Sequence, residues 1–283
     1  MIHKKCNIIS NQEIAAGSSG TARKSGSAGK SGAAGKSAAN SVFEMLVDTR
    51  DFPKSLPGQF IMVHLDKGEM LLPRPISICR QAENLMLLVY KVLGKGTEYL
   101  STFKPGDEIR LMGPLGNGFS FRDDLKKIAL IGGGIGIPPM VSIYDAIKDR
   151  DIEIHVYLGY KDGHFLTNLF PGAKLHIITE NLDTFKDPPY PSGEVFPEKG
   201  NTITLLEHFN EDYDEMYACG PKPMLSALTK FAADKNIPLQ ISLEERMACG
   251  VGVCMGCVVP PDYMKICCAG PVFYSDKVVL DCE

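Results

Sequence analysis

Short apolar runs, separated by turn residues, make up the first 122 residues of the chain. Pairs such as Pro57-Gly58 and Pro105-Gly106 stand between the runs. Strands of this length and spacing are typical of a small antiparallel β-barrel, because the chain must reverse direction at every turn. The predicted strands are 6–9, 42–47, 59–65, 76–79, 84–92 and 108–112.

Residues 18–41 interrupt this pattern with a stretch that is nearly all Ser, Gly, Ala and Lys. The stretch has no acidic residue and no large apolar side chain. Such a segment buries too little surface to offset the entropy lost on ordering, so we expect a flexible loop or linker. With this insert set aside, residues 14–17 and 42–47 form the two strands of one predicted hairpin.

Beyond residue 126 the pattern changes to buried strands that alternate with helices. This alternation predicts a doubly wound α/β domain built on a parallel sheet. The predicted strands are 127–131, 153–158, 174–179 and 215–218, and the predicted helices are 141–149 and 223–235. We therefore expect a multidomain β plus α/β chain: an antiparallel β-barrel over residues 1–122, a parallel-sheet domain over 123–240 and a small cysteine-rich lobe over 241–283.

Four cysteines near the C-terminus have the spacing of an iron–sulfur site. Cys249, Cys254 and Cys257 are separated by four and by two residues, and Cys267 lies further along. This is the plant-type pattern for a [2Fe-2S] cluster, and the glycines between the thiols allow the tight loop that a cluster needs. Structural zinc, the alternative, usually uses two short Cys pairs, and only Cys254/Cys257 is one. We therefore favour a cluster over zinc, and over a disulfide framework.

Composition limits the cellular location and the classes of binding partner that we expect. The net charge of −4 gives no reason to expect nucleic acid as a partner. No run of roughly 18 apolar residues exists to span a membrane. Nine cysteines without an export signal point to a reducing, cytoplasmic location.

Two residue clusters in the predicted barrel suit a flavin dinucleotide. In the first, Arg74 offers a planar fork for a phosphate and Ser77 offers a hydroxyl. In the second, Gly94 and Gly96 let the backbone approach an anion, and Thr97 opens a predicted short helix whose N–H groups hold phosphate. Taken singly, each cluster is better explained without a ligand, as a surface arginine on an edge strand and a glycine hairpin turn, but together, beside a cluster motif, they favour FAD. The predicted flavin residues are Arg74, Pro75, Ile76, Ser77, Tyr90, Lys91, Val92, Gly94, Gly96 and Thr97.

The glycine-rich turn after strand 127–131 lies where an α/β domain places a pyrophosphate. It departs from the G-x-G-x-x-G pattern, because Ile137 stands in place of the third glycine, so it is a weak signal alone. A second strand-to-helix turn at 219–221 supports a nicotinamide dinucleotide. The predicted residues are Gly133, Gly134, Gly136, Cys219, Gly220 and Pro221.

The order of these motifs resembles the ferredoxin–NADP reductase superfamily, since Arg-Pro-x-Ser, Gly-x-Gly-Thr, Gly-Gly-x-Gly-x-x-Pro and Cys-Gly-Pro occur in turn. The cysteine block and the Gly-Pro-Val-Phe at 270–273 narrow the resemblance to the electron-transfer subunits of type B dihydroorotate dehydrogenase. It covers nearly the whole chain except 18–41. It implies FAD on the barrel, NAD on the α/β domain and one [2Fe-2S] cluster in the C-terminal lobe. The implied cluster ligands are Cys249, Cys254, Cys257 and Cys267, with family spacing selecting Cys267 over Cys268.

The resemblance also implies a partner, the FMN-containing dihydroorotate dehydrogenase catalytic subunit, in an α2β2 heterotetramer of pyrimidine biosynthesis. Electrons from dihydroorotate would pass from FMN through the cluster to FAD, and then as a hydride to NAD+. The residues themselves leave the choice between NAD and NADP open, because Lys161 would favour a 2′-phosphate and Asp162 would disfavour one. The resemblance to the family favours NAD. Two alternatives stay open: the small subunit of an NADH-dependent ferredoxin:NADP+ oxidoreductase or sulfide dehydrogenase, and a zinc-stabilised, non-enzymatic interaction module.

Overall fold

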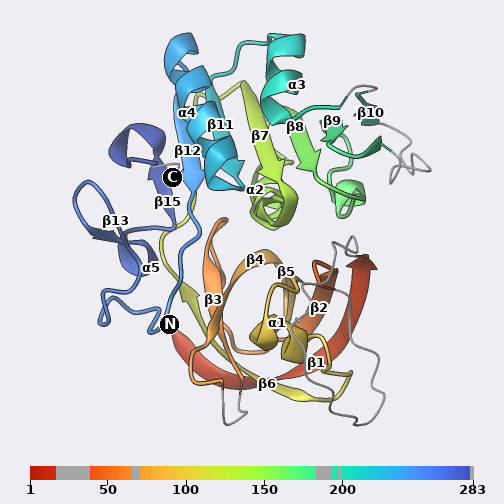
Figure 1. The fold of residues 1–283 in the computed structure, drawn as a ribbon, viewed down its shortest axis with the longest axis vertical. Helices are drawn as coiled ribbons and strands as arrows, with labels where there is room; N and C mark the ends of the chain where they lie inside the picture. The colour runs from red at the N-terminus through yellow and green to blue at the C-terminus, as the bar shows by residue number, and fades with distance from the viewer. Residues whose placement is uncertain (17–38, 66–69, 183–192, 197–198, 281–283) are drawn as a thin grey trace, which may run out of the picture.

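The computed structural model describes residues 1–16, 39–65, 70–182, 193–196 and 199–280. Figure 1 shows a β-barrel, a twisted sheet flanked by helices, and a C-terminal lobe beside both. The insert predicted at 18–41 lies outside the described residues, apart from its last three positions. No helix in the described part is long and apolar enough to cross a membrane.

Six strands close into the predicted antiparallel barrel, in the order β1-β2-β5-β4-β3-β6. Every second residue of β6 is buried, so one face of that strand points into the barrel. Strands β1 and β2 pair antiparallel across the insert, with Ser10 opposite Leu46, which confirms the predicted hairpin. The strands are β1 (Ile2–Ala15), β2 (Val42–Asp48), β3 (Phe60–His64), β4 (Arg74–Ala82), β5 (Leu85–Lys91) and β6 (Glu108–Leu115), and the short helix α1 (Lys95–Leu100) lies between β5 and β6.

The α/β part is a seven-stranded sheet in the order β10-β9-β8-β7-β11-β12-β15. All neighbouring strands pair parallel except β12 and β15, which are antiparallel. The strands are β7 (Lys127–Gly133), β8 (Glu153–Tyr160), β9 (Lys174–Thr179), β10 (Gly193–Val195), β11 (Glu215–Cys219), β12 (Leu239–Ser242) and β15 (Val272–Tyr274). The parallel sheet is therefore confirmed, with an antiparallel strand added at its edge.

Helices cover both faces of this sheet. Helix α2 (Ile137–Ile147) packs on one face, and α3 (Thr202–Phe209) and α4 (Lys222–Lys235) pack on the other. Helix α2 begins before the predicted residue 141, because Pro138 and Pro139 occupy its first turn, where the absent N–H groups cost nothing.

Helix α2 also joins the sheet to the barrel, since it packs against β4 (Figure 1). The guanidinium of Arg80 on β4 donates through Nη2 to Asp145 Oδ1 on α2 at 3.0 Å. The Gly58 N–H donates to the Ser142 hydroxyl at 3.2 Å. The two bodies therefore have a fixed contact, and the space between them has a defined shape.

The C-terminal lobe contains β13 (Val258–Val259), β14 (Met264–Lys265), α5 (Ile266–Ala269) and the 3-10 turn η4 (Ser275–Lys277). It packs on the barrel through Phe60, Met62 and Leu115. Strand β15 leaves the lobe to join the sheet, so this lobe contacts both larger bodies. The domain limits proposed from sequence stay predictions.

Candidate functional site

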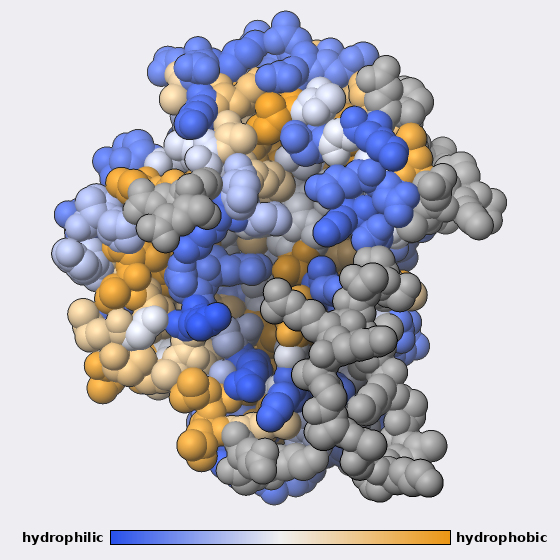
Figure 2. Space-filling model, viewed as in Figure 1, coloured by the Kyte–Doolittle hydropathy of each residue, from blue (hydrophilic) through white to orange (hydrophobic). Residues whose placement is uncertain are grey.

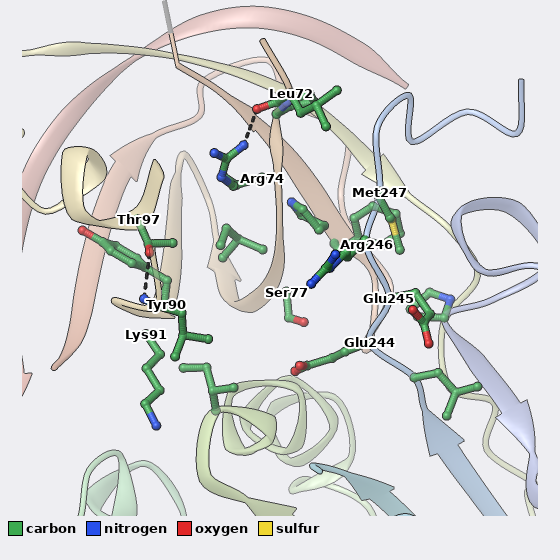
Figure 3. Close-up of a pocket in the computed structure, with 18 of the residues that line it drawn as sticks. Leu72, Arg74, Ser77, Tyr90, Lys91, Thr97, Glu244, Glu245, Arg246 and Met247 are labelled. Atoms are coloured by element: carbon green, nitrogen blue, oxygen red, sulfur yellow. Dashed lines mark hydrogen bonds between the residues drawn. The ribbon is translucent and has the colours of Figure 1, made fainter. Parts of the chain in front are cut away.

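One cavity of about 830 Å³ lies where the barrel, the sheet and the C-terminal lobe meet (Figure 3). A cavity of this size accommodates a large organic cofactor. Its barrel wall consists of Phe60, Met70, Leu71, Leu72, Pro73, Arg74, Pro75, Ile76, Ser77, Val89, Tyr90, Lys91, Leu93 and Thr97. Its other walls consist of Ile135, Lys222, Ser242, Leu243, Glu244, Glu245, Arg246, Met247 and Pro271.

Arg74, the first residue of β4, lies against the start of α1. A Cβ added to Gly96 would lie 2.2 Å from Arg74 Nε, so only glycine leaves room for this guanidinium. Arg74 also donates through Nη1 to the carbonyl of Leu72 (Figure 3). The position of the arginine is thus set from two sides, and its fork is available at the cavity wall for an anion.

Helix α1 begins at Lys95, two residues before the predicted start at Thr97. The hydroxyl of Thr97 instead caps the turn: it accepts hydrogen bonds from the N–H groups of Leu93 at 2.9 Å and Gly94 at 3.3 Å. This fixes the loop that faces the cavity.

Most of the predicted flavin residues line one cavity, although they come from separate segments. Those on its wall are Arg74, Pro75, Ile76, Ser77, Tyr90, Lys91 and Thr97, whereas Val92, Gly94 and Gly96 are not among its lining residues. The Tyr90 ring belongs to the barrel core, where its hydroxyl donates to Asn11 Oδ1 at 2.8 Å and burial raises the phenol pKa.

The segment Ser242–Met247, which runs from the last residue of β12 toward Cys249, has no predicted role, and the structure places it on the cavity wall. In Figure 3, Glu244 points into the cavity and Arg246 extends toward Ser77. The surrounding protein removes water from the Glu244 carboxyl, and this desolvation raises its pKa, although the residue is exposed to the cavity. The signal that sequence reasoning missed is a charged run just after a buried strand of a parallel sheet, at the edge where such sheets bind ligands.

The two predicted strand-to-helix turns touch each other at the carboxyl ends of β7 and β11. A Cβ added to Gly136 would lie 2.2 Å from the carbonyl oxygen of Cys219, so the turns pack backbone to backbone. Gly133 and Gly220 both pack against Met224, and a Cβ there would lie 2.5 and 2.4 Å from that side chain. Gly134 has a φ of +52° and has no neighbour within 4 Å of the Cβ position. The glycine turn in front of α2 thus leaves open space at Gly134, where an anion could approach the backbone.

The cysteine loop directs backbone N–H groups at its sulfurs. The Gly252 N–H donates to Cys267 Sγ at 3.1 Å, and the N–H groups of Val251 and Cys254 each donate to Cys249 Sγ at 3.4 Å. The hydrogen bond from Val251, followed by that from Cys254, lowers the pKa of the Cys249 thiol to about 6. Gly250 and Gly252 have φ values of +69° and +79°, which allow these turns. A donor set of four thiols with N–H groups aimed at sulfur fits an iron–sulfur cluster.

The thiols differ in exposure. Cys257 and Cys267 are buried, whereas Cys254 and Cys268 are exposed. Burial raises the pKa of the Cys267 thiol to about 12. Among the described residues, no three His, Cys, Asp or Glu side chains gather around one point that would hold a single metal ion. The match to a cluster therefore rests on the donor set and on the N–H groups.

The exposed part of this loop carries apolar side chains. The exposed fractions of Val251, Val253 and Met255 are 38%, 79% and 50%, and that of Tyr263, in the turn between β13 and β14 of the same lobe, is 72%. Figure 2 shows hydrophobic residues on the side of the molecule where Figure 1 places the lobe. We name these four residues the loop patch.

Comparison with known proteins gives consistent results. Residues 244–279 match the family model of the iron-sulfur cluster binding domain of dihydroorotate dehydrogenase B. The chain is 37% identical over 248 residues to the dihydroorotate dehydrogenase B (NAD(+)) electron transfer subunit of Caldanaerobacter subterraneus subsp. tengcongensis, with 85% of this chain and 94% of that protein covered. The Listeria innocua protein of the same name is 34% identical over 254 residues, covering 86% of this chain and 94% of the relative.

A solved structure of an NADH-dependent reduced ferredoxin-NADP oxidoreductase superposes with a TM-score of 0.75. The superposition covers 97% of this chain and 90% of that one, at 24% identity. At this identity the likeness establishes the fold, a ferredoxin reductase-like barrel and sheet.

Proposed function

The chain belongs to the family of electron-transfer subunits of dihydroorotate dehydrogenase B, and we propose on this basis that it carries electrons from dihydroorotate to NAD+ in pyrimidine biosynthesis. It is an oxidoreductase subunit that uses FAD, a [2Fe-2S] cluster and NAD. When bound, these groups let single electrons from a cluster be collected on a flavin and passed to NAD+ as a pair. The observation that carries the proposal is that one cavity is lined by the barrel, by Ile135 of the glycine turn and by the cysteine lobe.

The barrel wall is the proposed flavin site. The Arg74 guanidinium, placed by Gly96 and Leu72, holds a phosphate, and Lys91 supplies a second positive charge. Ser77 faces the cavity from β4, beside Arg246 (Figure 3). Its hydroxyl would bond a polar atom of the flavin ring. The apolar wall excludes water around the ring. The proposed flavin residues remain Arg74, Pro75, Ile76, Ser77, Tyr90, Lys91, Val92, Gly94, Gly96 and Thr97, with Tyr90 acting through its backbone.

The touching turns at the sheet edge are the proposed NAD site. Pyrophosphate would bind at the glycine turn in front of α2, where the missing side chains let an anion approach the backbone and the helix dipole favours a negative charge. Ile135, within the first turn, also lines the flavin cavity, so a nicotinamide held here would lie next to the flavin. The proposed residues are Gly133, Gly134, Gly136, Cys219, Gly220 and Pro221.

The proposed cluster ligands are Cys249, Cys254, Cys257 and Cys267. The sulfurs of Cys267 and Cys268 lie 3.8 Å apart, so either could be near a cluster. Cys267 is favoured because it is buried and accepts a hydrogen bond from the Gly252 N–H, whereas Cys268 is exposed. Cluster loading needs reduced thiols, which suits a cytoplasmic location.

The loop patch is the proposed docking face for the catalytic partner. A subunit that delivers electrons must approach the cluster, and the exposed side of the loop carries apolar residues rather than charges. We propose that the partner is an FMN-containing dihydroorotate dehydrogenase subunit and that the assembly is an α2β2 heterotetramer.

Co-expression with a type B dihydroorotate dehydrogenase catalytic subunit tests this function. We expect the complex to reduce NAD+ with dihydroorotate anaerobically, and the catalytic subunit alone to fail. Val253→Asp should weaken co-purification, whereas Ile9→Asp, on β1 and 47% exposed, is the matched control. Ferredoxin-dependent NADP+ reduction without any dihydroorotate activity would instead favour the other oxidoreductase class.

A further inference from the structure

The turn that leaves the barrel after β6 holds the chain segment that follows Cys267 and Cys268. Four hydrogen bonds join Asn117 to residues 269–272. Its side-chain Nδ2 donates to the carbonyls of Ala269 at 2.9 Å and Val272 at 2.8 Å. Its Oδ1 accepts from the Val272 N–H at 3.0 Å, and its own N–H donates to the Gly270 carbonyl at 2.6 Å. One side chain thus uses both its donor and its acceptor group on the same short segment.

The neighbouring Gly116 is an independent sign of this close approach. It has a φ of +73°, and an added Cβ would lie 2.6 Å from both the Gly270 carbonyl oxygen and Pro271 Cδ. The same Cβ would lie 3.0 Å from the Phe60 ring, which lines the cavity. The turn is therefore packed between the barrel wall and the segment 269–272.

That segment connects the proposed cluster to the flavin cavity. Cys267, buried in the lobe, precedes it by two residues, and Pro271 within it lines the cavity. The Pro271 carbonyl accepts from the Leu243 N–H at 2.9 Å, which joins it to a second cavity residue. A shift of 269–272 would therefore move a cluster ligand relative to the flavin wall.

We propose that Asn117 is a positioning residue that fixes the distance between the Cys267 ligand and the flavin cavity. The inference rests on the proposed function, because it needs both cofactors in the places given above. Residues that hydrogen-bond to the segment carrying a metal ligand set the orientation of that ligand. A site whose supporting residues are lost becomes less active while its ligands stay in place. Electron transfer falls steeply with distance, so a small loosening slows the transfer between the two groups.

The test uses the purified full chain with its cofactors. Asn117→Ala removes the three side-chain hydrogen bonds, and Asn117→Asp keeps the shape and the acceptor but loses both donations. Ser120→Ala is the matched control on the same connection, since its hydroxyl makes no hydrogen bond within the described residues. Iron and flavin contents are measured first. Stopped-flow mixing with NADH then follows the flavin and cluster bands separately, and hydrogen exchange reports on residues 264–272.

We expect both Asn117 variants to keep iron and flavin and to bleach the flavin at the wild-type rate. Cluster reduction should slow about tenfold or more, and amides of 264–272 should exchange faster. A wild-type rate of cluster reduction in both variants would overturn the inference, and so would loss of iron in both, which would mean that Asn117 only holds the loop together. A wild-type chain without iron or flavin would overturn the proposed function itself, and this inference with it.

Discussion

The guanidinium of Arg74, the first residue of β4, lies directly against the backbone of Gly96 in helix α1. A Cβ at position 96 would lie within 2.5 Å of three guanidinium atoms: Nε at 2.2 Å, Nη2 at 2.3 Å and Cζ at 2.5 Å. The glycine therefore matters because of what it leaves room for. A close approach of a positive charge to a glycine backbone is a feature expected of a phosphate site.

We expect Gly96→Ala to weaken FAD binding about tenfold or more, because the arginine must leave its place. Arg74→Ala should cost roughly 1.5–3 kcal/mol, the value of a charge-assisted hydrogen bond. In a double-mutant cycle, Gly96→Ala should have little further effect once Arg74 is Ala, since the clash has gone. Flavin retention under dilution measures each step. Additive losses would show that the two positions act independently.

Cys254→Ser should lose the cluster iron while FAD remains bound, because a serine hydroxyl does not replace a thiolate ligand. Cys268→Ser is the matched control, and it should keep wild-type iron, since Cys268 is exposed and is not a proposed ligand. Iron assay and visible spectra under anaerobic conditions give the answer. Equal iron loss in the two variants would contradict the assignment of Cys267 as fourth ligand.

Asp162 is expected to set the preference for NADH over NADPH. It follows the carboxyl end of β8, and Asn181 Nδ2 donates to its Oδ1 at 3.1 Å, which orients the carboxylate. A like charge repels a 2′-phosphate, so Asp162→Ser should narrow the ratio of kcat/KM values by about tenfold. Asp151→Ser, before the amino end of β8, is the control. An unchanged ratio in Asp162→Ser would place the discrimination elsewhere.

His176 should make the sheet domain sensitive to acid. Its ring is 8% exposed, stacks on Tyr157 with a centroid distance of 4.7 Å, and has no hydrogen bond at either nitrogen within the described structure. Burial, followed by the charges of His155 and Lys174, lowers its pKa to about 4. The unfolded chain takes up this proton near the ordinary value of 6.5, so stability is complete above pH 6.5 and falls toward pH 4.

At ~1.4 kcal/mol per unit of pKa shift, the effect is on the order of 3 kcal/mol over that window. His176→Phe keeps a ring in place and removes the titration, so it should lose less stability than wild type between pH 7 and pH 5. Denaturant unfolding at several pH values measures this. His208→Gln, an exposed histidine on α3, is the control. Parallel pH profiles for His176→Phe and wild type would count against this role.

Sequence predicted the barrel and the sheet because both depend on local properties of the chain. The alternation of apolar residues in 108–112 and the turn residues before it are enough to indicate β6, although the strand continues to Leu115. The strand β15 was not predicted, because its three residues carry too little pattern, and its pairing with β12 is a long-range contact.

The candidate site divides in the same way. The spacing of Cys249, Cys254 and Cys257 and the order of the motifs are properties of the covalent chain, so the sequence alone indicated a cluster, a flavin and a nicotinamide. The role of Glu244 and Arg246 as cavity residues and the hold of Asn117 on 269–272 appeared only in three dimensions. These contacts join segments far apart in the chain, and packing, rather than local preference, brings such segments together.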